Sequence, residues 1–289
     1  MAVVNTNIGA SIAQSALMRN ERALNTAMEQ LSTGRKINSA ADNAAGLAIS
    51  SRMTSQIKGL GAAISNANDA VSMISTAEGA LDEITNMLQR MRELAVQSGT
   101  GTTDSSDRSY LNTEYQALRA EIDRIADNTE WNGRNILDGN AGASATGGAS
   151  SVAFQVGADA GQTFSTNFGN FTNGASGVMS ALVSTYLSAA SIGSAIQAAS
   201  NAITEVDTAI AGVSSQRATF GAASNRLTHT IDNLTNVKTN AEGARSRILD
   251  TDYAAATSEL ARTQIIQQAG TAMLAQANQM PATVLALLQ

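Results

Sequence analysis

The 289-residue sequence has no cysteine, one proline, one tryptophan and only 3% aromatic residues. The missing cysteine excludes disulfide bonds, thiolate nucleophiles and thiolate metal ligands, and it suits a reducing compartment and an exported protein equally well. The small side chains that dominate instead fill little volume, so helices built from them pack closely in thin rods. We therefore expect modest apolar burial within one chain and further burial against neighbouring copies.

The chain is also short of positive charge and of long apolar runs. Its net charge is −6, its pI is about 4.8, and no cluster of Lys and Arg offers the phosphate contacts that nucleic-acid binding needs. No segment approaches the ~20 apolar residues of a membrane-spanning helix. The N-terminus lacks the charged and apolar regions of a secretory signal. We expect neither nucleic-acid nor membrane binding, and a location in the cytoplasm or beyond a specialised export route.

Apolar residues at steps of three and four predict one long helix over residues 44–97. This is the spacing of a coiled-coil seam, with one break around Glu78. At ~1.5 Å per residue such a helix is roughly 80 Å long, which few globular domains contain. The seam residues are Ile57, Leu60, Ile64, Ala67, Val71, Ile74, Leu81, Ile84, Leu88, Met91 and Ala95.

A second, shorter helix is predicted after the glycine-containing stretch 98–101. Thr103 and Ser106 offer N-caps, and Asp104 and Asp107 place negative charge where the helix macrodipole favours it. The apolar steps of this helix match those of the long helix, so we expect it to fold back against the long helix. Its apolar residues are Leu111, Tyr115, Leu118, Ile122 and Ile125.

The middle of the chain has a different composition. Residues 139–177 contain nine glycines, a single charged residue (Asp159) and four of the five Phe. Apolar residues alternate on either side of a possible turn at 157–161, which predicts a β-hairpin with one Phe-bearing face covered. A disordered glycine-rich linker is the alternative. The alternating residues are Val152, Phe154 and Val156, then Phe164, Thr166 and Phe168.

A third long helix is predicted in residues 178–242, again with a seam at steps of three and four. The predicted fold is therefore mainly α: a long antiparallel coiled-coil rod, a small β-hairpin region at its tip, and paired terminal helices at the other end. The seam residues of the third helix include Ile192, Ile196, Ala199, Ile203, Val206, Ile210, Val213, Phe220, Leu227, Ile231 and Leu234.

Of the two terminal segments, residues 1–43 carry apolar residues on one helical face, whereas one isolated amphipathic helix is a poor description of residues 243–289. The second segment has no charged residue after Arg262. We predict that both segments drive assembly by packing on several partners. The assembly residues are Leu17, Leu24, Met28 and Leu31 in the first segment, and Leu260, Ile266, Met273, Leu274, Val284, Leu287 and Leu288 in the second.

Both terminal regions also contain ordered motifs that closely resemble bacterial flagellins. The resemblance covers roughly residues 1–140 and 195–289. At the N-terminal end it is carried by residues 32–40 (STGRKINSA), 42–49 (DNAAGLAI), 66–69 (NAND), 78–81 (EGAL) and 88–97 (LQRMRELAVQ). At the C-terminal end it is carried by residues 244–248 (ARSRI), 252–253 (DY), 267–270 (QQAG), 275–279 (AQANQ), Pro281 and 284–288 (VLALL).

The resemblance implies a structural subunit that polymerises into the flagellar filament for swimming motility. It implies terminal arms (1–43 and 243–289) that line the filament's inner tube, a rod domain (44–138 and 178–242) around it, and a short middle (139–177) without large outer domains. Such subunits leave the cell through the flagellum's own export apparatus and become extracellular. The implied partners are other copies, an export chaperone, the filament cap and hook-associated proteins.

A further implied partner is an animal host's Toll-like receptor 5, which binds the released monomer of flagellins that it detects. The residues that match its binding surface are Arg90, Leu94 and Glu114. Arg90 and Leu94 are four residues apart, so we expect them to share one face of the long helix. An Arg with forked donors, an apolar anchor and an acid at the rim suit a protein interface.

The sequence shows no catalytic or metal-binding pattern. His229 is the only histidine, and a lone helical histidine is far more often structural or solvated than catalytic. No His-Glu-x-x-His pair exists, so the protease-bearing type of flagellin is excluded. We expect no enzyme activity, no cofactor and no metal. Two alternatives remain at this point: a hook–filament junction protein of the same architecture, and a coiled-coil signalling rod.

Overall fold

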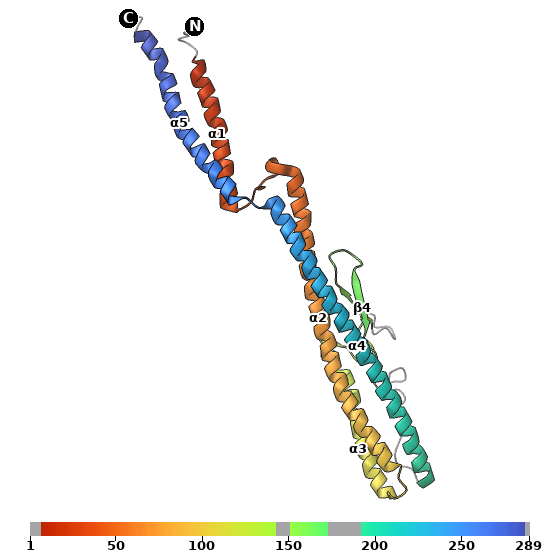
Figure 1. Cartoon of the computed structure of the whole chain (residues 1–289). Helices are drawn as coiled ribbons and strands as arrows, with labels where there is room; N and C mark the ends of the chain where they lie inside the picture. The colour runs from red at the N-terminus through yellow and green to blue at the C-terminus, as the bar shows by residue number, and fades with distance from the viewer. Residues whose placement is uncertain (1–6, 143–150, 173–191, 287–289) are drawn as a thin grey trace. The chain divides into compact units, whose positions relative to one another are not determined.

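The structure is a computed structural model that describes residues 7–142, 151–172 and 192–286. The chain divides into two compact units: an arm unit (residues 1–57 and 239–289) and a rod unit (residues 58–238). The described residues are mainly helical, as predicted. The helices are α1 (Ile8–Thr33), α2 (Ala40–Ser98), α3 (Ser105–Asn128), α4 (Ile192–Leu249) and α5 (Tyr253–Ala286) (Figure 1).

The long helix predicted over residues 44–97 is confirmed as the main part of α2. Asn43 departs from helical geometry (φ −164°, ψ 98°), and its side-chain Oδ1 accepts the N–H of Gly46 at 2.8 Å. Asn43 therefore caps the straight part of the helix. The predicted break at Glu78 is absent, because Ala77 is fully buried at the seam position. The buried seam in the rod unit is Leu60, Ala63, Ala67, Ala70, Ile74, Ala77, Leu81, Ile84, Leu88, Met91 and Ala95.

Helix α4 runs antiparallel to α2 within the rod unit (Figure 1). Two ion pairs between exposed side chains join the helices, Arg92–Asp207 at 2.6 Å and Arg217–Asp82 at 3.0 Å. The buried residues of α4 repeat at the same heptad spacing as those of α2, and those from Ala202 to Leu227 belong to the same core. They are Ala195, Ala199, Ala202, Val206, Ala209, Val213, Phe220, Ala223, Leu227 and Leu234.

Helix α3 folds back on α2, as predicted, and buries Tyr115, Ile122 and Ala126 in the shared core. Its N-cap residue is Asp104 rather than Thr103 or Ser106. The turn before it is held by the buried Arg108, whose guanidinium donates to the carbonyls of Ser98 at 3.0 Å and Thr100 at 2.8 Å. A cation there satisfies carbonyls that the C-terminus of α2 leaves without helical partners.

Two short antiparallel strand pairs follow α3. Strands β1 (Glu130–Trp131) and β2 (Arg134–Asn135) are joined by Asn132 and Gly133, both at positive φ, which is the geometry of a two-residue type I′ turn. Strands β3 (Ser151–Gln155) and β4 (Thr163–Asn167) form the predicted hairpin. Phe164, Thr166 and Phe168 are buried, so the linker alternative is wrong for residues 151–167.

The position of this hairpin differs from the expected tip. It lies alongside α2 and α4 within the rod unit (Figure 1). Asn66 of α2 donates to the carbonyl of Gln155 at 3.0 Å, and Gln216 of α4 donates to that of Asn167 at 2.6 Å. The physical reason is aromatic burial: Phe168 stacks at 5.2 Å from Phe220, and Arg226 lies 4.9 Å over Phe164. Those ring contacts exist only along the side of α4.

Candidate assembly surface

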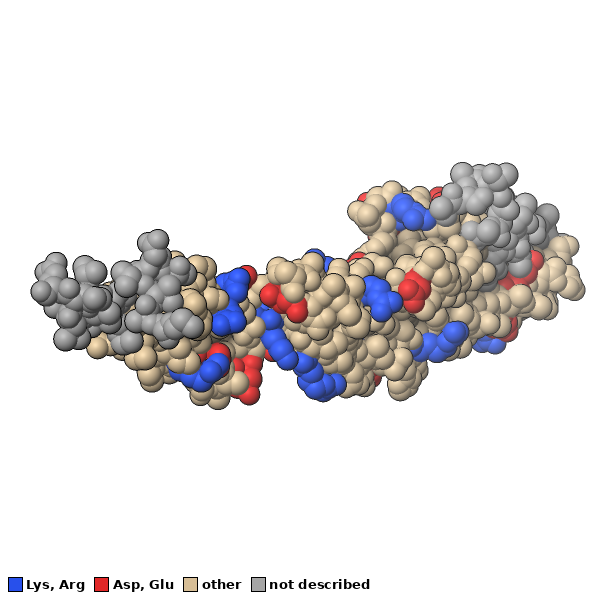
Figure 2. Space-filling view, turned by 90° about the horizontal axis from the view of Figure 1, so that it is seen from above, with Lys and Arg blue, Asp and Glu red and all other residues tan. Residues whose placement is uncertain are grey.

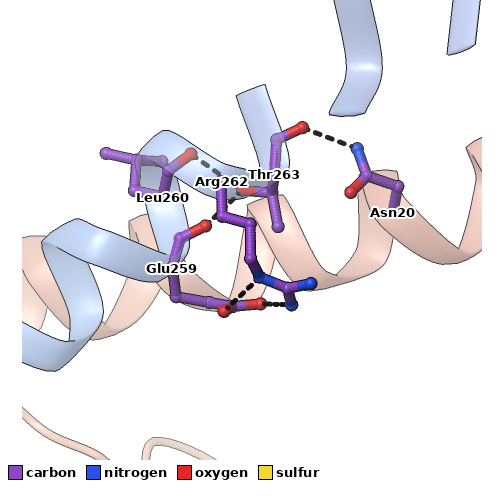
Figure 3. A network of polar contacts seen from close by, with 5 residues as sticks. All are labelled: Asn20, Glu259, Leu260, Arg262 and Thr263. Atoms are coloured by element: carbon purple, nitrogen blue, oxygen red, sulfur yellow. Dashed lines mark hydrogen bonds and ion pairs between the residues drawn. The ribbon is translucent and has the colours of Figure 1, made fainter. Parts of the chain in front are cut away.

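The two terminal helices, α1 and α5, pair antiparallel in the arm unit (Figure 1). The side-chain amide of Asn7, which also caps α1, donates to the carbonyl of Ala277 at 2.8 Å. Nearer the other end, the amide of Asn20 donates to the carbonyl of Thr263 at 2.8 Å (Figure 3). These contacts align the start of α1 with the end of α5 and position the side chains described below.

The pair buries little within one chain. Among the side chains described in α1 and α5, only Ala27, Ala256 and Thr263 are buried. The remaining seam residues are half-buried because a single partner helix covers only one side of each. Five predicted assembly residues belong to this half-buried seam: Leu17, Leu24, Leu31, Leu260 and Leu274.

Three other predicted assembly residues point away from the seam. Met28, Ile266 and Met273 are 54%, 41% and 67% exposed. The side chain of Val284 lies outside the described part of α5, and Leu287 and Leu288 lie outside the described residues. The structure adds exposed apolar residues that the prediction did not single out for assembly, and their apolar character was the available signal. They are Ile8, Ile12, Met18, Tyr253 and Ile265.

Polar contacts fasten the segments that connect each arm helix to the long helices. Gly34 ends α1 with a left-handed backbone (φ 68°), which glycine adopts without strain. The Lys36 N–H donates to the Leu249 carbonyl at 2.7 Å, and the Thr251 N–H donates to the Gly34 carbonyl at 3.0 Å. The two connections therefore run as one backbone-bonded bridge inside the arm unit.

Asp42 holds the first of these connections. Its Oδ2 accepts the N–H of Ser39 at 2.9 Å and that of Asn38 at 3.0 Å. Hydrogen bonds from these two backbone groups, Ser39 first, hold the pKa of Asp42 below its ordinary value. The carboxylate is therefore charged at neutral pH.

The three predicted receptor-contact residues do not share one surface. Arg90 donates to Glu114 at 2.8 Å and to Glu93 at 2.9 Å, and all three side chains are substantially exposed. Hydrogen bonding to Glu114, then to Glu93, raises the pKa of Arg90. Leu94 is fully buried in the rod core, so its expected place on the exposed face is wrong. Four residues turn a helix by about 400°, so Leu94 is rotated by about 40° from Arg90 around the axis of α2. This rotation is enough to bury Leu94, because both α3 and α4 cover α2.

Beside Arg90 lies a shallow hollow lined by Gln89, Arg92, Glu93, Val96 and Gln97. Val96 is the exposed apolar residue there, at 51%. On the face of the molecule in Figure 2, Lys and Arg are interspersed with Asp and Glu rather than gathered in one field. The hollow and Arg90 beside it can offer forked donors and one apolar contact to a protein partner.

Neither metal sites nor membrane spans emerge from the described residues. In residues 7–142, 151–172 and 192–286, no group of three or more His, Asp or Glu side chains is placed to hold a metal ion. Across those same ranges, no helix is both long and apolar enough to cross a membrane.

Both ends of the chain match family descriptions. Residues 4–142 match the bacterial flagellin N-terminal helical region, and residues 203–288 match the bacterial flagellin C-terminal helical region. A solved structure described as that of a flagellar hook-associated protein from Vibrio parahaemolyticus has a TM-score of 0.59 at 17% identity, covering 72% of this chain and 100% of that one. At this identity the likeness concerns the fold alone.

Relatives align along the whole chain. The chain is 43% identical over 287 residues to a flagellin of Halalkalibacterium halodurans, which covers 99% of this chain and 100% of the relative. It is also 43% identical over 307 residues to a flagellin of Bacillus subtilis, with 99% of each covered. The chain therefore belongs to the bacterial flagellin family, whose members are structural subunits of the flagellar filament.

Proposed function

We propose that copies of this chain join through the exposed apolar faces of α1 and α5. The observation that carries the proposal is the set of exposed Ile and Met on α1 and α5, among whose described side chains only three are buried. No charged side chain occurs in residues 1–18 or 263–289, so covering these segments desolvates no side-chain charge. Neighbouring arm pairs would supply the apolar burial that one chain lacks.

Polymerisation of single-residue variants tests the proposal. Ile12→Asn and Ile265→Asn place an amide on the exposed faces and should abolish filament growth in a precipitating salt, seen by sedimentation and negative-stain microscopy. Tyr110→Asn is the control, since Tyr110 is 74% exposed but lies on α3. Filaments of normal length from both arm variants would overturn the proposal.

The same faces need a cover before assembly. We infer that an export chaperone binds the charge-free C-terminal arm, and that the filament cap and hook-associated proteins meet the arms at the filament ends. Export through the flagellar apparatus leaves the subunit outside the cell. Deleting residues 263–289 should abolish chaperone co-purification, whereas Leu88→Ala in the rod core should leave it intact.

We also propose that the released monomer binds Toll-like receptor 5 through Arg90 and Glu114, with Leu94 acting only in core packing. The support is an exposed ion pair at 2.8 Å beside a hollow that contains Val96. Arg90→Ala and Glu114→Ala should each weaken activation of receptor-reporter cells. Arg124→Ala removes a similar exposed pair elsewhere on α3, at 2.5 Å from Glu121, and is the control. A silent wild type, or equal potency of all the proteins, would reject this surface.

A further inference from the structure

The seam between α1 and α5 repeats every seven residues in both helices. An added Cβ on Gly270 would meet Leu17 Cδ1 at 2.8 Å, so this leucine sits directly on the glycine. When facing positions are counted by heptads from this contact, with the two helices antiparallel, each large seam residue faces a small one. The facing pairs are Leu17 with Gly270, Leu24 with Thr263, Leu31 with Ala256, Ala13 with Leu274, and Ala27 with Leu260.

This alternation brings the two backbones close, and Cα atoms of α1 and α5 repeatedly lie within 8 Å of each other. It does not define a single alignment. If α1 moved by one heptad along α5, Leu17 would face Ala277 or Thr263 instead of Gly270, and large residues would still face small ones. Apolar packing alone therefore leaves registers about 10 Å apart nearly equivalent.

One pair of facing polar residues in the seam makes these registers unequal. Asn20 is the polar residue among the α1 seam positions from Ala10 to Leu31, and by the same count it faces Gln267. Its amide donates to the carbonyl of Thr263, one helical turn away, at 2.8 Å (Figure 3). Thr263 is 1% exposed, and its own hydroxyl donates to the carbonyls of Glu259 and Leu260.

A slipped register would separate these groups. Asn20 would then face Leu260 or Leu274, and Gln267 would face Ala27 or Ala13. Two half-buried amides would lie against apolar side chains, and unpaired buried amides are costly. A single polar residue in a coiled-coil seam is an established way to select one register at some cost in stability.

We propose that Asn20 is a positioning residue that sets the register of the α1–α5 pair. The inference rests on the proposed assembly through the arms, because every copy must present Ile12, Met273 and their neighbours at the same height. A copy slipped by one heptad would show these residues displaced by about 10 Å and could not extend the polymer. The backbone bridge between residues 34–36 and 249–251 is the competing determinant of register.

Disulfide trapping separates the two determinants, and the chain has no cysteine of its own to interfere. Ala10→Cys with Ala277→Cys reports the observed register, because Asn7 links the backbones at these two positions. Leu17→Cys with Ala277→Cys reports a slip of one heptad. A disulfide needs Cα atoms about 4.4–6.8 Å apart, so each pair closes in only one register.

Each reporter pair is combined with Asn20→Leu or with Asn25→Leu, the control on the exposed face of α1. We expect the slipped pair to close only with Asn20→Leu, which should also gain helix content and lose polymer yield. A residue that merely stabilised the helices would lower helix content instead. Closure of the observed pair alone in Asn20→Leu would overturn the register role. Oxidation also traps arm pairs that form only transiently in soluble chains, so a wild type that never polymerises would contradict the assembly proposal without affecting this readout.

Discussion

The rod unit and the arm unit both carry heptad seams, but they bury them to very different degrees. In the rod unit the seam residues of α2 from Ala67 to Ala95 are almost completely buried between α3, α4 and the β3–β4 hairpin. In the arm unit most of the described seam residues of α1 and α5 are only half-buried. The rod unit thus has a core complete within one chain, whereas the arm unit has half of one.

Charge follows the same division. The rod unit contains ten basic and seventeen acidic residues, and the arm unit contains eight and seven, with none in residues 1–18 or 263–289. A net negative surface keeps a finished unit soluble. In the arm unit, the segments without charged residues carry exposed Ile and Met, and such a surface suits contact with partners. The same heptad repeat therefore encodes a finished core or an unfinished one, according to how many of its faces are covered.

The largest expected effect is the complete loss of polymerisation when both arms are removed. In free chains, protease should remove both arms and leave a fragment of about residues 45–240, because ordering each arm residue costs ~1–2 kcal/mol and the pair buries little in return. The trimmed fragment should keep its helix content and fail to polymerise, as measured by circular dichroism and sedimentation. Arms that resist protease as well as the rod does would contradict the division between a finished rod unit and an unfinished arm unit.

Two matched side-chain substitutions, one in each unit, test this division further. Leu88→Ala removes a fully buried rod side chain and should lower the free energy of unfolding by about 2–5 kcal/mol, with little effect on polymer growth near room temperature if the rod still folds. Met273→Ala removes an exposed arm side chain and should change the monomer by less than about 0.5 kcal/mol. It should nevertheless slow polymerisation. Urea titration and seeded growth measure the two quantities, and equal destabilisation by both would contradict the division.

Much of the fold could be predicted from the sequence because heptad spacing depends on local repetition. The apolar steps gave α2 to within a residue or two of its observed straight part. The apparent break at Glu78 came from passing over Ala77, which fills that seam position completely, although Ala67 and Ala95 were counted in the seam. In a chain with so few bulky residues, alanine has to be read as a core residue.

Contacts between distant segments were harder to predict. The hairpin was found by its alternation, but its place beside α4 depends on Phe220, Gln216 and Arg226, which no local pattern connects to it. Leu94 was placed on the surface by its four-residue spacing from Arg90. Its burial depends on how many helices surround α2, and spacing along one helix does not contain that information.

A smaller effect concerns a flaw inside the finished core. Tyr115 is fully buried, and within the described residues its hydroxyl is the buried side-chain group with no hydrogen-bond partner. Tyr115→Phe removes this hydroxyl and should raise the free energy of unfolding by about 1–3 kcal/mol. Tyr110→Phe, on the exposed face of α3, is the control and should have no effect. A destabilised Tyr115→Phe protein would mean that the hydroxyl is satisfied.

The same tyrosine gives the rod unit a pH signature. Burial raises the pKa of Tyr115 to about 12 from an ordinary value of 10.0. The folded state therefore holds this proton more tightly, so its contribution is complete below pH 10 and is lost as the pH rises towards 12. Unfolding titrations between pH 9 and 12 should show stability falling more steeply in the wild type than in Tyr115→Phe. Parallel curves would remove Tyr115 as the cause.

The smallest effect tests whether anything in the arm unit is fixed before assembly. The connecting segment is the best candidate, because Asp42 accepts the N–H groups of Ser39 and Asn38 without help from another copy. Asp42→Ala should speed hydrogen exchange at these two amides, whereas Asp69→Ala on an exposed face of α2 should not.

The lowered pKa of Asp42 means that the wild-type bonds persist above the ordinary value of 3.8 and are lost as the pH falls below it. Protection at Ser39 should therefore fall in acid for the wild type only. If neither acid nor substitution changes it, the segment is as unformed as the arms in the free chain, and the boundary between finished and unfinished structure lies further into α2.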